Sequence, residues 1–269
     1  MAICSQLREK RMDLRLPYGI VYGPHESLRL GLSLGVDLTP MTCTFDCVYC
    51  ERGRTLVKIR NPSEFRSEVS EEDFLEALQG GLKRTGRRDL KSITFSGTGE
   101  PTLEPRLGEF IQTAKRVSSL PVKVITNASL LTRAEVRRRL LKADEVIAKM
   151  NATSNSVFWS MHEPADQNLT SGKIAEGISR LIDEKGTSVT VEVLFITGSP
   201  SGLNTNDTKE ETRGIAKILR EIQPGNVQIH TVRRSPARPM VKPVSRDFLL
   251  WAMREFRKEL GGERVQAFF

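Results

Sequence analysis

Residues 35–50 of the chain read G-V-D-L-T-P-M-T-C-T-F-D-C-V-Y-C and join a short strand pattern to a cysteine cluster. Cys43, Cys47 and Cys50 have the spacing C-x3-C-x2-C. Three thiolates on one short loop can bind three irons of a cubane cluster and leave the fourth iron without a protein ligand. An open iron can bind and reduce a small molecule directly. The stretch therefore predicts a [4Fe-4S] cluster beside a strand end.

Two other interpretations of these cysteines stay open. A structural zinc site usually has four ligands, and only Cys4, far upstream, is available to complete such a set. Inert buried cysteines are the second alternative, although three of them on one polar loop would fill a core in an unusual way. A tight cysteine cluster in a reducing compartment favours metal binding over disulfide bonds. Cys4 lies far from the cluster and is interpreted as an incidental thiol.

Outward from this loop, short strand patterns alternate with amphipathic helix patterns. The predicted strands are Gly35–Leu38, Ser92–Phe95, Val122–Thr126, Val146–Met150, Val189–Phe195 and Val227–Thr231. Three predicted helices follow the capping pairs Ser70/Asp73 and Thr132/Glu135 and the residue Pro105. Three more span residues 174–182, 215–222 and 245–260. This alternation leaves an open doubly wound sheet or a (βα) barrel. Both folds place the working site at the carboxyl ends of the strands.

Candidate site residues follow several of these strands. After the second strand, Gly97 and Gly99 would let a ligand approach the backbone, and Glu100 is an acceptor for an ammonium group. An ordinary strand-end turn is the alternative there. The candidates after the other strands are Asn127, Lys149, Asn151, Arg233 and Arg234. The arginines suit a phosphate or carboxylate of a substrate, while solvated arginines and turn-forming asparagines are the alternatives.

Composition limits the classes of function. The chain has 269 residues, 38% of them hydrophobic and 28% charged, which suits one large domain or two small ones. No apolar run approaches the roughly 20 residues that span a bilayer, and the N-terminus has no apolar signal core, so we expect a cytoplasmic protein without membrane contact. The net charge of +8 favours acidic partners such as RNA, although the basic residues are spread along the chain.

The cysteine loop, with the aromatic Tyr49 before its last cysteine, resembles the radical S-adenosylmethionine (SAM) superfamily. Residues 31–40 and Ser96–Thr102 extend the resemblance to one branch of poorly characterised archaeal and bacterial proteins grouped with wyosine-tRNA synthase relatives. The resemblance covers residues 18–245. It implies an α/β fold, a partial (βα)6 TIM-like barrel of the radical SAM type with short terminal extensions. The implied parts are an N-terminal extension (1–17), the barrel (18–243) and a C-terminal helix packed on the barrel (244–269).

The resemblance also implies roles for individual residues. Cys43, Cys47 and Cys50 would ligate the cluster, and the amino and carboxylate groups of SAM would chelate its open iron. The implied SAM-binding residues are Tyr49, Gly97, Thr98, Gly99, Glu100 and Asn127. The usual pattern has two adjacent glycines before the glutamate, whereas this chain has Thr98 and Gly99, which puts the local backbone in doubt. Many branch members have an aspartate near residues 149–151, and this chain has none there.

The implied reaction begins when flavodoxin or ferredoxin reduces the cluster. SAM is then cleaved to methionine and a 5′-deoxyadenosyl radical, which abstracts hydrogen from a substrate. The branch and the charge of +8 suggest tRNA modification, but the wyosine synthases carry additional N-terminal cysteines, where this chain has only Cys4. Radical activation of a protein or small molecule is the alternative. A non-catalytic iron–sulfur electron-transfer module is the third possibility.

Overall fold

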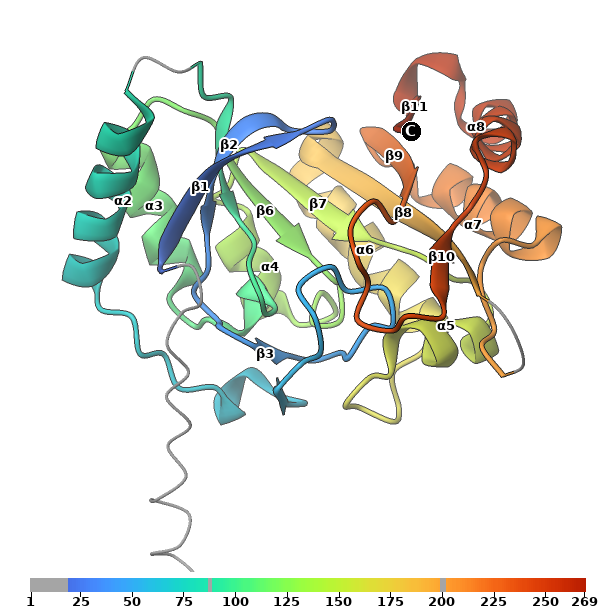
Figure 1. Cartoon of the computed structure of the whole chain (residues 1–269), viewed down its shortest axis with the longest axis horizontal. Coiled ribbons are helices and arrows are strands. Elements are labelled where there is room, and N and C mark those ends of the chain that lie inside the picture. Colours follow the sequence, from blue (N-terminus) through green and yellow to red (C-terminus); the bar gives the residue numbers. More distant parts are fainter. Residues whose placement is uncertain (1–18, 87–88, 199–201) are drawn as a thin grey trace, which may run out of the picture.

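One curved sheet organises the computed structural model, which describes residues 19–86, 89–198 and 202–269 (Figure 1). Within these ranges the sheet has nine strands, eight of them in the order β1-β2-β5-β6-β7-β8-β9-β11. The parallel strands are β2 (Gly31–Val36), β5 (Ser92–Phe95), β6 (Val122–Thr126), β7 (Glu145–Lys149), β8 (Val189–Gly198), β9 (Asn226–Thr231) and β11 (Val265–Ala267). β1 (Val21–Ser27) pairs antiparallel with β2 at one edge, and β10 (Val241–Pro243) pairs antiparallel with β8.

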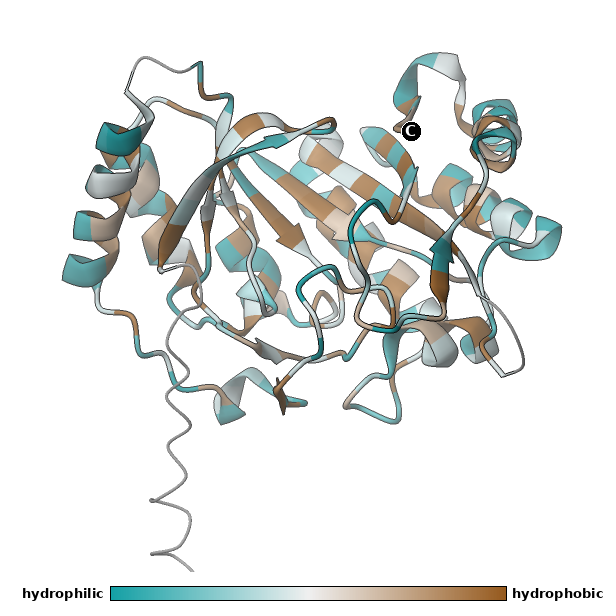
Figure 2. Ribbon diagram, viewed as in Figure 1, coloured by the Kyte–Doolittle hydropathy of each residue, from teal (hydrophilic) through white to brown (hydrophobic). Residues whose placement is uncertain are grey.

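The central strands are buried because their sequences are apolar on both faces. Every residue of β5 is buried, as are the first eight residues of β8. Parallel strands that are covered on both sides read in this way, as continuous apolar runs. Figure 2 shows these strands as the most hydrophobic part of the molecule, with hydrophilic outer faces on the surrounding helices.

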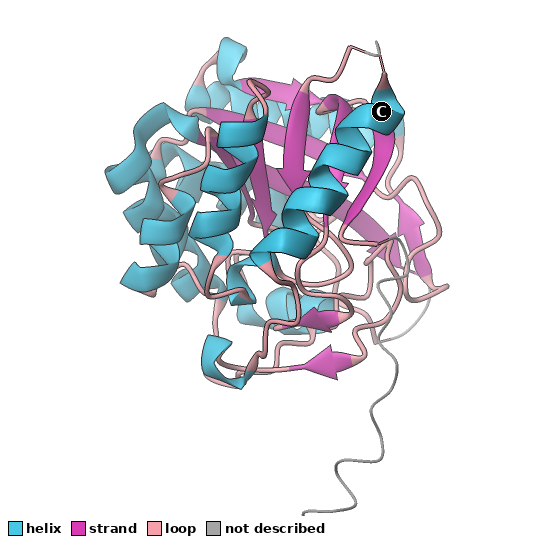
Figure 3. Ribbon diagram, turned by 90° about the vertical axis from the view of Figure 1, so that its left-hand side faces the viewer, coloured by secondary structure: helices cyan, strands magenta, loops and turns pink. Residues whose placement is uncertain are grey.

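Helices cover the outer side of the sheet (Figures 1 and 3). They are α2 (Glu71–Thr85), α3 (Leu107–Val117), α4 (Ala134–Leu140), α5 (Asn155–His162), α6 (Ser171–Lys185), α7 (Lys209–Ile222) and α8 (Arg246–Leu260). In α2 the cap predicted at Ser70 is confirmed, because its side chain accepts a hydrogen bond from the Asp73 backbone. The buried rings of Phe74 on α2 and Phe110 on α3 meet edge to face at 5.0 Å, which ties these two helices together.

The prediction of a partial (βα)6 TIM-like barrel is confirmed. All six predicted strands are present and parallel, and the sheet curls without closing, from β1 at one edge to β11 at the other. The predicted cap at Thr132 is wrong. α4 instead begins at Ala134, and its N-cap residue Arg133 makes no side-chain cap hydrogen bond. The predicted N-terminal extension (1–17) and Cys4 lie outside the described residues.

Several regular elements lie where the sequence predicted none, among them β1, β11 and the short helix α5. β1 and β2 form a hairpin whose tip reaches toward β9 and β11 (Figure 1). α8 packs against α7 and β11 on the other side of the molecule. In the part of the chain that the structure describes, no helix is both long enough and apolar enough to cross a membrane.

Candidate active site

The cysteine loop is held in place by backbone hydrogen bonds to the end of α5. It begins at β3 (Thr42–Cys43), which pairs with β4 (Val57–Lys58). The Val48 amide donates to the Met161 carbonyl at 3.0 Å, and the Arg238 amide donates to the Val48 carbonyl at 3.0 Å. The loop is therefore fixed by segments more than 100 residues further along the chain.

The carboxylate of Asp46 adds a second set of anchors inside the loop. Its Oδ1 accepts from the Thr55 amide at 2.9 Å, and its Oδ2 accepts from Arg54 and Arg238, each at 3.0 Å. Although burial acts in the opposite direction, these hydrogen bonds and the charge of Arg238 lower the pKa of Asp46. The carboxylate is thus held ionised between two arginines, and this orders the residues between the cysteines.

Tyr49 is buried behind the loop and is oriented by Asn151. The Asn151 amide nitrogen donates to the Tyr49 hydroxyl at 2.7 Å, and its oxygen accepts from the Leu194 amide at 2.8 Å. The ring of His162 meets the ring of Tyr49 edge to face at 5.6 Å. Tyr49 lines the cavity described below, whereas Asn151 does not. The structure therefore gives Asn151 a contact with Tyr49 and no exposure to that cavity.

The turn after β5 packs directly on the cysteine loop. A Cβ on Gly97 would stand 2.2 Å from the Asp37 carboxyl carbon, and one on Gly99 would stand 1.9 Å from the Thr39 carbonyl oxygen. Both glycines line the cavity. The absence of a side chain at these two positions therefore makes room for the protein's own atoms. These contacts do not test the prediction that a ligand approaches the backbone closely here.

Thr98 bridges the turn and the cysteine loop with its hydroxyl group. Its Oγ1 donates to Asp37 Oδ2 at 2.7 Å and accepts from the Met41 amide at 2.8 Å. The Thr98 amide also donates to Asp37 Oδ2, at 2.8 Å. The side chain found here in place of a glycine therefore supplies two hydrogen bonds that fix the turn.

Glu100 is buried beneath this turn and accepts several hydrogen bonds. Its Oε1 accepts from the hydroxyls of Thr102 and Thr126, each at 2.6 Å, and its Oε2 accepts from the Asn127 amide at 2.8 Å. Burial raises the pKa of Glu100, with these hydrogen bonds acting in the opposite direction. Oε2 has one described donor and keeps capacity for another, because a carboxylate oxygen accepts two hydrogen bonds.

Asn127 lies at the end of β6, and its side chain has partners within the protein. Its Nδ2 donates to the Thr44 hydroxyl at 2.9 Å and lies 3.5 Å from Cys43 Sγ. Its Oδ1 accepts from the Ser129 amide at 3.0 Å. Asn127 thus ties β6 to the cysteine loop beside Cys43, within the cavity wall.

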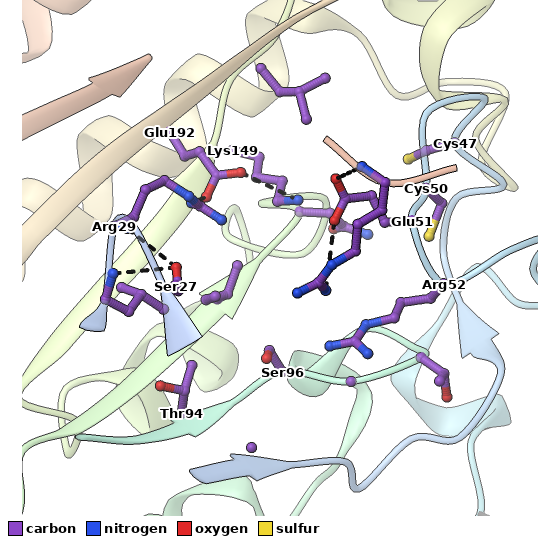
Figure 4. Close-up of a pocket in the computed structure, with 18 of the residues that line it drawn as sticks. Ser27, Arg29, Cys47, Cys50, Glu51, Arg52, Thr94, Ser96, Lys149 and Glu192 are labelled. Atoms are coloured by element: carbon purple, nitrogen blue, oxygen red, sulfur yellow. Dashed lines mark hydrogen bonds and ion pairs between the residues drawn. The ribbon is translucent and has the colours of Figure 1, made fainter. Parts of the chain in front are cut away.

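These residues line one cavity of about 640 Å³ (Figure 4). Its wall includes all nine residues predicted as cluster or SAM contacts, namely Cys43, Cys47, Tyr49, Cys50, Gly97, Thr98, Gly99, Glu100 and Asn127. Three of the other candidates, Lys149, Arg233 and Arg234, line it as well. The volume is in the usual range of about 300–1,000 Å³ for small-molecule sites. The structure therefore brings residues from five strand ends into a single space.

The family model of the radical SAM superfamily matches residues 39–200, which include the cysteine loop and the glycine turn. The chain belongs to the radical SAM superfamily. It is therefore an enzyme of that class, as its sequence indicated. Membership also implies a [4Fe-4S] cluster, SAM and a source of electrons.

Known relatives of this radical SAM protein are similar over most of their length. It is 29% identical to the UPF0026 protein of Methanocaldococcus jannaschii over 248 residues, 92% of this chain and 74% of that protein. It is 32% identical to a UPF0026 protein of Helicobacter pylori strain 26695, over 86% of this chain and 71% of that protein. The chain therefore also belongs to the UPF0026 family.

Among solved structures, the fold matches a radical SAM methyltransferase from Sphaerobacter thermophilus. The TM-score is 0.64 at 17% identity, over 88% of this chain and 65% of that chain. At this identity the match shows the shared fold, a radical SAM barrel, and the chain spans just under two thirds of the methyltransferase.

The cysteines suit the cluster that the radical SAM superfamily implies. All three thiols line one cavity, as the ligands of a cubane with one open iron would. Burial, together with the charge of Glu100, raises the pKa of the Cys43 thiol to about 12, and burial raises the pKa of Cys47 as well, so iron has to displace the protons of these thiols. No three His, Cys, Asp or Glu side chains of residues 19–86, 89–198 and 202–269 stand together as ligands of one metal ion. A cubane has no need of such convergence, because each thiolate binds a different iron.

Sequence reasoning missed a group of charged residues in the same cavity. Arg29, Glu192 and Arg52 line it, and none was a candidate. Glu192 is the one charged residue of the buried strand β8. A single acidic residue there is a possible signal, because a buried charge requires a partner. Arg29 is 163 positions from Glu192 in the chain, so no local pattern connects the two.

Proposed function

We propose that this protein binds a [4Fe-4S] cluster through Cys43, Cys47 and Cys50 and cleaves SAM reductively to act on a substrate by hydrogen abstraction. One observation carries the proposal. The three cysteines line the same cavity as Glu100, within a superfamily whose members share this chemistry. When bound, the cluster and SAM supply one chemistry: an electron reaches the SAM sulfonium and gives methionine and a 5′-deoxyadenosyl radical.

The three thiols lose their protons when they bind iron. Because the pKa of Cys43 is raised to about 12, iron binding has to displace a thiol proton at neutral pH, and assembly releases protons to solvent. Asp46 and the hydrogen bonds from α5 fix the loop before the metal binds.

Glu100 is the proposed acceptor for the SAM ammonium group. Glu100 lines the cavity, and its Oε2 has one described donor, from Asn127, so a cationic donor would complete its coordination. Thr102 and Thr126 hold the carboxylate through Oε1. Tyr49 and the turn Gly97–Gly99 are proposed to form the walls beside SAM.

An external protein is proposed to supply the electron, and reduced flavodoxin or ferredoxin fits this role. A cytoplasmic location is proposed with it. A tRNA substrate remains a prediction from the resemblance to the wyosine-tRNA synthase relatives and from the charge of +8. Radical activation of a protein or small molecule is the alternative. A cluster of charged side chains in the cavity favours a small molecule.

The test is an anaerobic assay of SAM cleavage. The protein is reconstituted with iron and sulfide and incubated with SAM and dithionite, and 5′-deoxyadenosine is measured. We expect product from the parent and none from Cys43→Ala, Cys47→Ala or Cys50→Ala, which should also lose iron. Cys4→Ala, outside the motif, is the matched control and should keep both properties. A parent protein that binds zinc and forms no cluster would contradict the proposal.

A further inference from the structure

Three side chains from distant parts of the chain meet around one buried carboxylate, that of Glu192. Glu192, whose side chain is 0% exposed, lies within β8. Its Oε1 lies 3.0 Å from His230 Nε2 on β9 and 3.4 Å from Lys149 Nζ at the end of β7. Its Oε2 pairs with Arg29 from the β1–β2 hairpin. All four residues line the cavity that contains the cysteines.

Figure 4 shows how this ionic cluster, defined as Arg29, Lys149, Glu192 and His230, lies relative to the cysteines. The side chains of Arg29 and Lys149 converge on Glu192 at one side of the view. Cys47 and Cys50 lie at the other side, and Glu51 is drawn between the two groups. The ionic cluster therefore faces the part of the cavity that lies across from the cysteine loop.

The charges in the ionic cluster do not balance. Burial acts to raise the pKa of Glu192, but Arg29 and Lys149 lower it well below its usual range, so the carboxylate is ionised. Burial acts to lower the pKa of Lys149, but Glu192 raises it, so the ammonium is ionised too. Arg29 and Lys149 thus share one negative charge, and the three residues carry a net charge of +1 before His230 is counted.

The ammonium of Lys149 is incompletely coordinated among the residues that the structure describes. A lysine ammonium has three donors. Its ion pair with Glu192 at 3.4 Å is long for a hydrogen bond, and its other contact is with the Tyr49 ring, at 6.0 Å from the centroid. The Lys149 side chain is 27% exposed, on the cavity side. Donors are therefore available to a ligand.

SAM does not need these cations under the proposed function. Its ammonium group has Glu100 as a partner, and its carboxylate is expected to bind the open iron. A nucleobase is uncharged and would give these cations no charged partner. The remaining candidate is a substrate with its own negative charge.

We propose that Arg29 and Lys149, oriented by Glu192, bind the carboxylate or phosphate group of a small substrate inside this cavity. The proposal rests on the proposed function and specifies its substrate class. A buried ion pair is weak evidence for stability alone, and the excess cation and its open donors fit a ligand site. Bidentate recognition by Arg29 together with the point charge of Lys149 suits either anion.

The test measures binding by isothermal titration calorimetry. The cluster-loaded protein with SAM and without reductant is titrated with malonate, inorganic phosphate and the neutral analogue malonamide. We expect malonate or phosphate to bind and malonamide not to bind. The preferred anion distinguishes a carboxylate from a phosphate substrate. Lys149→Met and Arg29→Met should weaken anion binding about 10- to 100-fold, since each removes a charged hydrogen-bond donor, and Lys149→Arg should largely restore it.

Lys123→Met is the matched control, because Lys123 pairs with Glu145 at 2.8 Å between neighbouring strands with similar exposure but outside this cavity. It should leave anion binding unchanged. The SAM affinity of each variant reports folding. Three outcomes overturn the proposal: no anion bound by the parent, equal binding by Lys149→Met, or a loss in Lys149→Met confined to SAM. The titration contains no reductant and does not depend on SAM cleavage. Absence of cleavage in the anaerobic assay would therefore overturn the proposed function, whereas the three outcomes above overturn the anion site.

Discussion

Gly99 lies so close to Thr39 that a Cβ at position 99 would stand 1.9 Å from the Thr39 carbonyl oxygen. A second carbonyl oxygen, that of Thr42, would be 2.1 Å away. Both are backbone atoms of the segment that leads into Cys43, so neither can move like a flexible side chain. The contact joins the turn that carries Glu100 to the loop that carries the cysteines.

Gly99→Ala should therefore destabilise the protein, by about 2–4 kcal/mol if the two segments are pushed apart. Urea unfolding under anaerobic conditions measures the free energy, and iron content after reconstitution should fall with it. Gly80→Ala is the control, because a Cβ there would come no nearer than 3.5 Å to the Arg84 side chain. In the helix α2 that change should gain up to about 1 kcal/mol. Equal stability of Gly99→Ala and the parent would contradict the contact.

Glu100→Gln should weaken SAM binding by about 10- to 100-fold, because a charged hydrogen bond contributes about 1.5–3 kcal/mol. Iron content should stay close to that of the parent. The measurement is equilibrium binding of SAM to the reconstituted protein. Glu104→Gln is a matched control, since Glu104 is also buried but does not line the cavity. If both variants bind SAM like the parent, Glu100 is not its ammonium partner.

The strands were predicted most accurately where their burial leaves a distinct pattern of hydrophobic residues in the sequence. Ser92–Phe95 and Val122–Thr126 were predicted with the bounds that the structure has. Ser92–Phe95 is buried throughout, Val122–Thr126 alternates buried and half-buried residues, and polar or turn residues stand on either side of both strands. The cysteines, Glu100 and Asn127 could be placed together for the same reason, because the carboxyl ends of parallel strands meet at one edge.

Features that depend on contacts distant in the chain could not be predicted. β11 has three residues, and its pairing with β9 is decided by the position of α8. Arg29 becomes a cavity residue because the β1–β2 hairpin folds back toward β8. Thr132 and Glu135 had the spacing of a helix cap, but α4 begins at Ala134 without one. Local propensity is a weak prior that tertiary packing overrides.

Thr98 offers a test of why this chain has a side chain where the superfamily usually has a glycine. Its hydroxyl joins Asp37 and the Met41 amide. Thr98→Val keeps the shape and removes both hydrogen bonds, so it should cost about 1–3 kcal/mol of stability. Thr98→Ser keeps the hydroxyl and should lie within about 1 kcal/mol of the parent. A chemical denaturation series compares them, and a smaller loss for Val than for Ser would refute the bridging role.

His162 should make stability depend on pH below neutrality. Burial lowers its pKa from 6.5 to about 4, so the folded protein keeps the ring neutral. The unfolded chain binds a proton below pH 6.5, and stability is therefore lost as the pH falls from 6.5 toward 4. Between pH 7 and pH 5 the expected loss from this residue is about 2 kcal/mol.

The measurement is the difference in urea unfolding free energy between pH 7 and pH 5, for the parent, His162→Gln and His25→Gln. A difference between two pH values cancels the constant packing cost of replacing a buried ring. His162→Gln should flatten the pH dependence by about 2 kcal/mol. His25 is exposed, so His25→Gln should retain most of the slope of the parent. If the three proteins lose the same free energy, the ring of His162 is protonated in the folded state at pH 5, and burial does not keep it neutral.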